Sequence, residues 1–417
     1  MVTFSTPKAP KGAPDIVPPR SAIYERVEAV ASERFRRYGY RRIETPAFEH
    51  TELFERGLAS GSDIVTKEMY TFEDKGGRSL TLRPDMTAPV VRALLENRLD
   101  KVGLPVKLYY VAPIFRHERP QAGRYRQFRQ AGVELVGATS PEADAEVIEL
   151  ASSVFRSLGL TQVSLLLNSI GHAQCRALYL PRLVQFLEAH RGQLCEDCQR
   201  KIERNPLRTF DCKVEQDQKV MLDAPLITDS LCSDCKSHHD AVKSLLTDVG
   251  VAFIEEPRLV RGLDYYSRTT FEFTSQGLGS QNAIGAGGRY DGLAELLGGD
   301  DLPGIGFGLG VDRIVMLLEE QPQAIRAFVV AVGEEARRAA FALVTRLREA
   351  GVSVDFDASG RGMKAQFKMA DRLGAEKVVI IGEREIATGL YAVKDMVSGE
   401  QETIEADGVG NHLKEQP

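Results

Sequence analysis

FRHERPQAGRYRQFRQAGVELVG, residues 115–137, is the stretch that decides the predicted fold. The apolar segment 106–114 before it favours a buried strand, and the second half of the stretch favours a return strand. Because the side chains of a strand alternate between its two faces, polar groups two residues apart share a face. The side chains expected to share the polar face of this hairpin are Arg116, Glu118, Phe128, Gln130, Gly132 and Glu134. Cation, carboxylate, aromatic and amide groups over one small area are typical of a binding pocket.

The loop of this hairpin is strongly basic. Between residues 116 and 129 there are five arginines and one glutamate, although the whole chain has a formal net charge of −6. A cationic loop in an acidic protein suits phosphate groups or an RNA backbone. The simpler interpretation is a charged hairpin exposed to solvent.

Two further short clusters combine charged and aromatic groups. In residues 83–87, RPDMT, a predicted strand end runs into a helix, and Asp85 and Thr87 flank the start of that helix. Taken alone, this pattern is also that of an ordinary helix cap. In residues 261–266, RGLDYY, a turn delivers one arginine and two phenols. The alternative for this cluster is a turn followed by core tyrosines.

Glycine alternates with apolar residues in GIGFGLG, residues 304–310, just before a helix that carries Arg313. Alternate glycines leave one face of a strand without side chains, so a flat ligand can approach the backbone closely. The spacing is neither that of a dinucleotide fingerprint nor that of a phosphate-binding P-loop.

The whole chain has 417 residues, which is enough for two or three domains with hydrophobic cores. Apolar residues make up 43% and charged residues 27%, as in ordinary globular proteins. No apolar run approaches the roughly 18 residues that suggest a membrane span, and the first 20 residues lack the apolar stretch of a secretion signal. We therefore expect a cytoplasmic protein without membrane contact.

The composition changes twice along the chain. Between about residues 172 and 250 it is rich in cysteine and polar loops, which indicates an insertion within a larger domain. Residues 321–323, QPQ, resemble a linker, and strand and helix patterns alternate after them, as in a small α/β unit. In that unit the segment 363–373 is predicted to be helical.

The insertion contains two Cys-x₂-Cys pairs, with Cys212, His238 and His239 nearby as further donors. The pairs are Cys195 with Cys198 and Cys232 with Cys235. This local spacing suits a structural zinc site. However, 33 residues separate the pairs, which exceeds the usual separation, so the sequence favours reduced cysteines packed in a small domain, with no metal ligand assigned.

Four of these segments, taken in order, resemble the bacterial histidyl-tRNA synthetases, a family of class II aminoacyl-tRNA synthetases. Residues 21–46 look like motif 1, a dimer element, and their apolar spacing predicts a helix over 21–38 followed by a strand over 40–46; 115–137 look like motif 2, and 304–318 look like motif 3. The RGLDYY element is similar to the signature of the histidine enzymes. The resemblance implies an α+β fold: an antiparallel sheet flanked by helices in a catalytic domain of residues 1–322, a helical insertion, and an α/β anticodon-binding domain of residues 324–417.

The resemblance also implies roles for individual residues. Arg116 would hold the α-phosphate and the histidine carboxylate, Arg261 would approach the α-phosphate, and Arg313 would clamp the distal phosphates, so these three would be catalytic. Glu118 would bind the adenine edge, and Phe128 would stack on the ring. The remaining histidine-binding residues would be Asp85, Met86, Thr87, Gln130, Glu134, Tyr265 and Tyr266. The residues implied to contact tRNA are Arg124, Arg361, Lys364 and Lys368, although the last three also fit a merely solvated helix face.

The activity implied in this way has two steps. Histidine is activated with ATP, which enters with Mg²⁺, to histidyl-adenylate, and the histidyl group then passes to the 3′ end of its tRNA. The expected assembly is a homodimer. Asp85 departs from the family pattern, because many bacterial members have Glu there. Asp is common in a silent paralogue, the histidine-sensing regulatory subunit of ATP phosphoribosyltransferase, which is the alternative function. That paralogue generally lacks the inserted and C-terminal domains and loses the catalytic cations.

Overall fold

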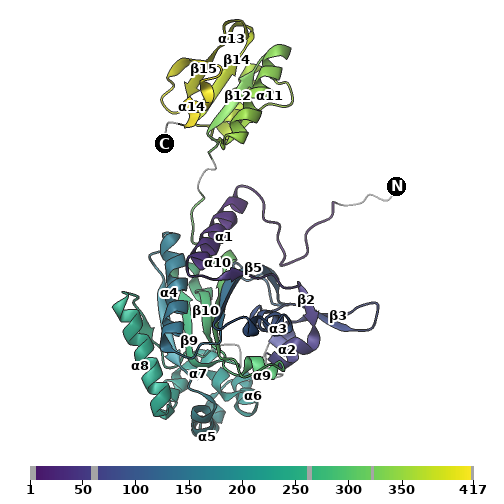
Figure 1. The fold of residues 1–417 in the computed structure, drawn as a ribbon. Coiled ribbons are helices and arrows are strands. Elements are labelled where there is room, and N and C mark those ends of the chain that lie inside the picture. Colours follow the sequence, from purple (N-terminus) through teal and green to yellow (C-terminus); the bar gives the residue numbers. More distant parts are fainter. Residues whose placement is uncertain (1–5, 58–63, 261–264, 321–323, 415–417) are drawn as a thin grey trace, which may run out of the picture. The chain divides into compact units, whose positions relative to one another are not determined.

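The computed structural model describes residues 6–57, 64–260, 265–320 and 324–414. These residues form two compact units, one ending at Glu319 and the other starting at Glu320 (Figure 1). Each unit has its own hydrophobic core. Arg261 and the rest of residues 261–264 lie outside the described part of the chain.

The first unit is built on an eight-stranded sheet with the strand order β1-β5-β6-β11-β10-β9-β7-β8. Its strands are β1 (Arg41–Arg42), β5 (Val106–Phe115), β6 (Gln127–Val136), β7 (Ser164–Ser169), β8 (Ile254–Glu255), β9 (Ser267–Thr274), β10 (Ala283–Arg289) and β11 (Gly304–Gly310). Only the edge pairs β1–β5 and β7–β8 are parallel. The predicted antiparallel sheet is thus confirmed, and the decisive hairpin is its β5–β6 pair, with Phe128 opposite Ile114.

Helices cover one face of this sheet and a mixed layer covers the other. The elements besides the insertion are α1 (Arg20–Arg37), α2 (Thr51–Gly57), η1 (Ile64–Glu68), α3 (Thr87–Glu96), η2 (Leu99–Lys101), α4 (Pro141–Ser157), η6 (Gln276–Gln281), α9 (Leu293–Leu296) and α10 (Val311–Val315). A small antiparallel sheet of β2 (Phe48–His50), β4 (Ser79–Leu82) and β3 (Tyr70–Glu73) lies beside them.

Alternation along β6 assigns the two faces of the large sheet. Ala131, Val133 and Leu135 are buried in the core that includes residues of α1 and α4. The residues between them, among them Gln130 and Glu134, point to the opposite face. One face of the sheet is therefore apolar and packed with helices, and the other is free to present polar groups.

Helix α1 shows how local sequence produces the covered face. Ile23, Val27, Ala31 and Phe35 recur at helical spacing and are buried. The helix ends at Arg37, and Gly39 follows with φ +82°, the left-handed conformation that terminates many helices. The predicted strand after it, β1, is only two residues long and does not extend to Pro46.

The insertion expected at about 172–250 is helical. Its elements are α5 (Ala173–Ala189), η3 (Arg191–Gln193), α6 (Glu196–Arg204), η4 (Pro206–Asp211), α7 (Glu215–Met221), η5 (Ile227–Ser230) and α8 (Ser233–Asp248). Its last helix, α8, lies beside α4, and Val242 and Leu246 of α8 join the core of the catalytic sheet (Figure 1). The insertion is therefore anchored to the sheet by its C-terminal helix.

The second unit is a five-stranded sheet with the order β13-β12-β14-β15-β16 and helices on both faces. Its elements are β12 (Ala327–Ala331), α11 (Glu334–Glu349), β13 (Val354–Phe356), α12 (Met363–Arg372), β14 (Lys377–Ile381), α13 (Glu383–Thr388), β15 (Leu390–Asp395), β16 (Gln401–Glu405) and α14 (Val409–Lys414). The first three strands are parallel and the last two are antiparallel. Throughout the described ranges of both units, no helix is long and apolar enough to cross a membrane.

Candidate active site

The polar face of the large sheet forms one wall of a cavity of about 430 Å³. Side chains from β5, β6, the start of α3, the segment after residue 264 and α10 line it. The predicted site residues found in its lining are Asp85, Thr87, Arg116, Glu118, Arg124, Phe128, Gln130, Tyr265, Tyr266 and Arg313. The structure thus brings together residues that are up to 228 positions apart in the sequence, Asp85 and Arg313 being the extremes.

A buried carboxylate, Glu134, lies behind this lining with 1% of its surface exposed. One of its oxygens accepts a hydrogen bond from the Thr87 hydroxyl at 2.8 Å, and the other accepts one from the Tyr290 hydroxyl at 2.7 Å. Burial raises the pKa of Glu134 to about 8, and these two hydrogen bonds oppose the rise. A cation bound beside this carboxyl group would lower its pKa and favour its charged form, so the position suits a cationic ligand.

The alternating glycines of β11 make room for side chains of β6. A Cβ at Gly306 would lie 2.0 Å from a carboxylate oxygen of Glu134, and a Cβ at Gly308 would lie 1.9 Å from the amide nitrogen of Gln130. Either substitution would therefore displace a polar side chain of the pocket wall. The glycines were predicted to allow close approach of a ligand; here they also accommodate the groups that would bind it.

Asp85 both caps helix α3 and lines the cavity. Its carboxylate accepts hydrogen bonds from the backbone N–H groups of Thr87 at 3.0 Å and Ala88 at 3.4 Å, so it caps α3 as the simpler interpretation expected. Burial raises the pKa of Asp85, and the nearby charge of Arg116 counteracts that rise. The capping role and the pocket role therefore coexist.

Two arginines of the cavity wall are held by backbone oxygens. Arg116 donates from Nε to the carbonyl of Pro84 at 2.8 Å, and its guanidinium lies 5.5 Å from the centre of the Phe128 ring. Arg313 donates to the carbonyls of Gly123 at 2.9 Å and Ala283 at 2.6 Å. These carbonyl hydrogen bonds orient the two guanidinium groups at the cavity, where cations of this kind suit phosphate oxygens.

The carboxylate of Glu118 pairs with Arg124 in the same loop. This ion pair lies in the lining of the cavity, so the two residues act as one unit in this structure. The cavity therefore offers a carboxylate-lined base for a cation and arginines for an anion, an arrangement that suits a charged amino acid beside a nucleotide.

Comparison with known proteins agrees with this geometry. The family model for histidyl-tRNA synthetase matches residues 12–314, and the model for an anticodon binding domain matches residues 326–416. The chain belongs to the histidyl-tRNA synthetase family. Its predicted family membership is thus confirmed.

Relatives and solved structures within this family match nearly the whole chain. It is 52% identical to the histidine–tRNA ligase of Streptomyces coelicolor over 410 residues, which cover 96% of each chain. It is 48% identical to the histidine–tRNA ligase of Halothermothrix orenii over 403 residues, which cover 95% of this chain and 96% of the other. The crystal structure of apo S. aureus histidyl-tRNA synthetase superposes with a TM-score of 0.82 and 38% identity, over 98% of this chain and all of that one.

Several residues of the cavity were not predicted from the sequence. Tyr110 and Tyr290 line it, and burial raises the pKa of both phenols well above the usual value. The position of Tyr110 opposite Gly132 in the hairpin register was a usable signal, whereas nothing marked Tyr290 beyond the glycines before it. Arg208 of the insertion also lines the cavity, although it is 92 residues after Arg116.

Other predicted residues are not among those that line the cavity. Met86 is fully buried at the start of α3 and is not among the lining residues, because its side chain packs in the core. Arg361, Lys364 and Lys368 are exposed at and near the start of α12 in the second unit. Arg361 and Asp357 form a long ion pair at 4.0 Å, which leaves the helix edge basic.

The two Cys-x₂-Cys pairs do not meet in one site, so the hypothesis of a common site for them is wrong. Cys195 and Cys198 lie with Cys212 and Asp217, whereas Cys232 and Cys235 lie with His172 and Cys175. Each pair begins a different helix, α6 or α8, and these starts are separated within the insertion. All six cysteines are free thiols.

Proposed function

We propose that this chain is a histidine–tRNA ligase, which activates L-histidine with ATP and transfers the histidyl group to tRNA. Family membership over nearly the whole chain supports the activity. The observation that carries the proposal is the cavity itself, where buried Glu134 with Thr87 and Tyr290 stands behind a wall that holds Arg116 and Arg313.

The amino acid would occupy the base of the cavity. Glu134, Asp85 and Gln130 would take the ammonium group and one nitrogen of the imidazole, and the phenols of Tyr265 and Tyr266 would lie at its ring. Tyr265 and Tyr266 are only 8% exposed, with ring centres 5.1 Å apart. An amino acid without imidazole nitrogens would leave buried polar groups unpaired, and such a loss can lower activation by about 10⁴ or more.

The nucleotide would occupy the part of the cavity that Phe128 and Arg313 line. The adenine ring would stack on Phe128, with its edge at Glu118, and ATP would enter with Mg²⁺ bound to its phosphates. In the first step a carboxylate oxygen of histidine attacks the α-phosphorus, a new phosphorus–oxygen bond forms, and pyrophosphate leaves. Arg116 would stabilise the charge that develops on the α-phosphate oxygens, and Arg313 the charge on the leaving group.

In the second step a hydroxyl of the terminal adenosine of tRNA attacks the carbonyl carbon of the adenylate, and AMP leaves. Arg261 would act at the α-phosphate in both steps; it lies outside the described residues, so this role remains a prediction. Arg124 would contact the incoming tRNA end. The second unit, residues 324–417, would bind the anticodon through Arg361, Lys364 and Lys368, and the chain would act as a homodimer in the cytoplasm.

The alternative, a histidine-sensing regulatory subunit without ligase activity, is not favoured. The matched relatives named as ligases span 95–96% of this chain, and the C-terminal part matches an anticodon binding domain. A sensor needs a histidine pocket but has no use for this domain or for the cations of the nucleotide subsite.

The test is pyrophosphate exchange with each of the twenty amino acids in turn, followed by charging of total tRNA with radioactive histidine. We expect exchange with histidine alone and charging of one tRNA species. Exchange without charging would contradict the second step, and histidine binding without exchange would favour the regulatory subunit.

A further inference from the structure

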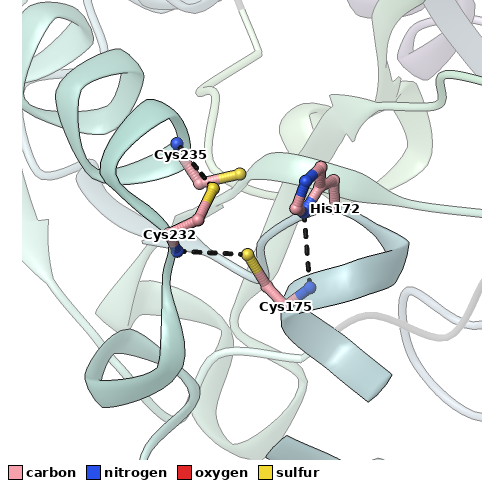
Figure 2. A group of neighbouring side chains, drawn as sticks. All are labelled: His172, Cys175, Cys232 and Cys235. Carbon is pink, nitrogen blue, oxygen red and sulfur yellow. Dashed lines mark hydrogen bonds between the residues drawn. The ribbon is translucent and has the colours of Figure 1, made fainter. Parts of the chain in front are cut away.

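His172, Cys175, Cys232 and Cys235 form a compact cluster where the first and the last helix of the insertion begin. His172 caps the N-terminus of α5 and Cys175 lies in its first turn, while Cys232 caps α8 and Cys235 lies in its first turn. One ligand atom from each residue lies within 4.8 Å of all the others. Figure 2 shows the four side chains approaching one another from these two helix starts.

We propose that this cluster is a structural zinc site. Three thiols and one imidazole are one of the standard donor sets of closed tetrahedral zinc sites. With zinc–sulfur bonds of about 2.3 Å, ligand atoms of a tetrahedron lie roughly 3.8 Å apart, so the observed grouping needs only a small contraction. Zinc would replace the thiol protons and hold the four residues together.

The backbone around the cluster is already arranged for thiolate ligands. The N–H of Cys235 donates to the sulfur of Cys232 at 3.4 Å, and the N–H of Cys232 donates to the sulfur of Cys175 at 3.3 Å (Figure 2). The positive ends of two helices also point at the site. Hydrogen bonds and helix ends of this kind stabilise the negative charge that sulfur carries when it binds a metal.

The second cysteine cluster has a different donor set. Cys195, Cys198 and Cys212 lie beside Asp217, whose carboxylate accepts from the backbone N–H of Cys195 at 3.0 Å and lies 3.3 Å from the Cys212 sulfur. Hydrogen bonds within the protein therefore already satisfy the carboxylate of Asp217, the fourth residue of this cluster. Because three cysteines and a carboxylate are not a standard structural zinc set, we assign zinc to the first cluster and use the second as its internal control.

Zinc at the first cluster would join the entry and the exit of the insertion. Cys175 and Cys232 are separated by 57 positions, and closing so long a segment with a metal restrains it effectively. The next helix turn adds His238, whose Nε2 lies 2.8 Å from the Asp144 carboxylate of α4. The site would thus fix the base of the segment that brings Arg208 to the cavity.

The test measures zinc by elemental analysis in the full chain, purified without a histidine tag. We expect about one zinc ion per chain in the wild type and in the control Cys212→Ser, and less than about a tenth in Cys175→Ser, Cys235→Ser and His172→Ala. His172→Cys should keep the metal, because four thiolates also form a standard site.

A second measurement does not depend on variants that fold poorly. Wild-type chain depleted of zinc should bind Co²⁺ with the absorption of a tetrahedral thiolate site, and protease should cut metal-free chain faster within 173–250. Zinc-free wild type that takes up no cobalt, or zinc retained by both Cys175→Ser and Cys235→Ser, would overturn the proposal. A second equivalent of zinc that is lost in Cys212→Ser would overturn the assignment of zinc to the first cluster alone. All these readouts are independent of ligase activity.

Discussion

The cations of the cavity and those of helix α12 are held in opposite ways. Arg116 and Arg313 are oriented by backbone carbonyls at 2.6–2.9 Å and lie against a cavity. Lys364 and Lys368 stand on an exposed helix edge. A charge fixed before the ligand arrives needs little reorganisation in the transition state, whereas an exposed charge contributes to binding through long-range attraction that salt screens.

This difference predicts which step of the proposed reaction each of the two units controls. The first unit orients partly buried charges at the cavity, so under the proposed function its residues should determine rate and amino-acid choice. The second unit presents exposed charges, so under the proposed function its residues should determine tRNA affinity. Four changes test this division, starting with the largest expected effect.

The largest effect should come from removing residues 321–417. Because each unit has a separate core, the remaining chain should fold, and adenylation of histidine should stay close to that of the full chain. Charging of tRNA should fall by more than about 10³, since several phosphate contacts disappear together. Parallel assays of pyrophosphate exchange and charging measure the two effects. Equal charging by the two chains would show that the C-terminal unit does not read the anticodon.

Arg116→Ala should lower the adenylation rate by about 10² to 10³, the usual loss when one transition-state donor is removed. Its neighbour Arg119 is exposed in the same loop and is not among the cavity-lining residues, so Arg119→Ala is the matched control. Single-turnover formation of histidyl-adenylate separates this loss from a change in binding. Near wild-type rates in the Arg116 variant would contradict its assignment.

Glu134→Gln should raise the KM for histidine by about 10-fold or more and leave the KM for ATP nearly unchanged, because a carboxyl group that would become charged beside the bound amino acid is lost. Tyr265→Phe should act in the same direction with a smaller effect. Glu118→Gln is the mirror control and should affect ATP instead. A Glu134 variant that changes only the KM for ATP would place this residue in the other subsite.

The raised pKa of Glu134 also predicts how the stability of the folded chain depends on pH. This pKa is about 8 in the folded chain and near 4.5 when unfolded, so the folded state holds the extra proton between these values. The unfolding free energy of the wild type should therefore decrease as pH rises from about 4.5 to 8. Glu134→Gln should weaken this decrease, which denaturant titrations at several pH values would measure.

The hairpin and its faces were predictable because they follow from local rules. The period of two along residues 127–136 put Gln130 and Glu134 on one face, and the structure has them there. The helix α1 followed equally from its apolar spacing. Such predictions succeed where a single element determines which way its side chains point.

Prediction from the sequence was incomplete where packing between distant segments determines which side chains share a site. The Cys-x₂-Cys spacing left a zinc site open but not favoured, and it could not show that each pair gains its partners from other segments, His172 and Cys175 in one case and Cys212 and Asp217 in the other. Tyr290 and Arg208 reach the cavity through sheet order and insertion packing, which no local pattern encodes. The histidine-binding role of Met86, which the resemblance implied, stays a prediction, and its side chain is buried in the core.

The smallest expected effect belongs to the exposed edge of α12. Lys364→Ala should weaken tRNA binding modestly, and the slope of log affinity against log salt should fall by about 0.7 to 0.9, the change for one lost phosphate contact. The adenylation rate should not change, because this residue lies in the second unit.

Arg338→Ala is the matched control for this variant. Arg338 is an exposed cation of α11, and α11 and α12 pack on opposite faces of the five-stranded sheet, so both variants remove one surface charge from the same unit. If general attraction to tRNA were the cause, both would lower affinity equally. A change of slope in Lys364→Ala alone would place the phosphate contact on α12, whereas equal slopes in both variants and the wild type would reduce that basic edge to an ordinary solvated helix face.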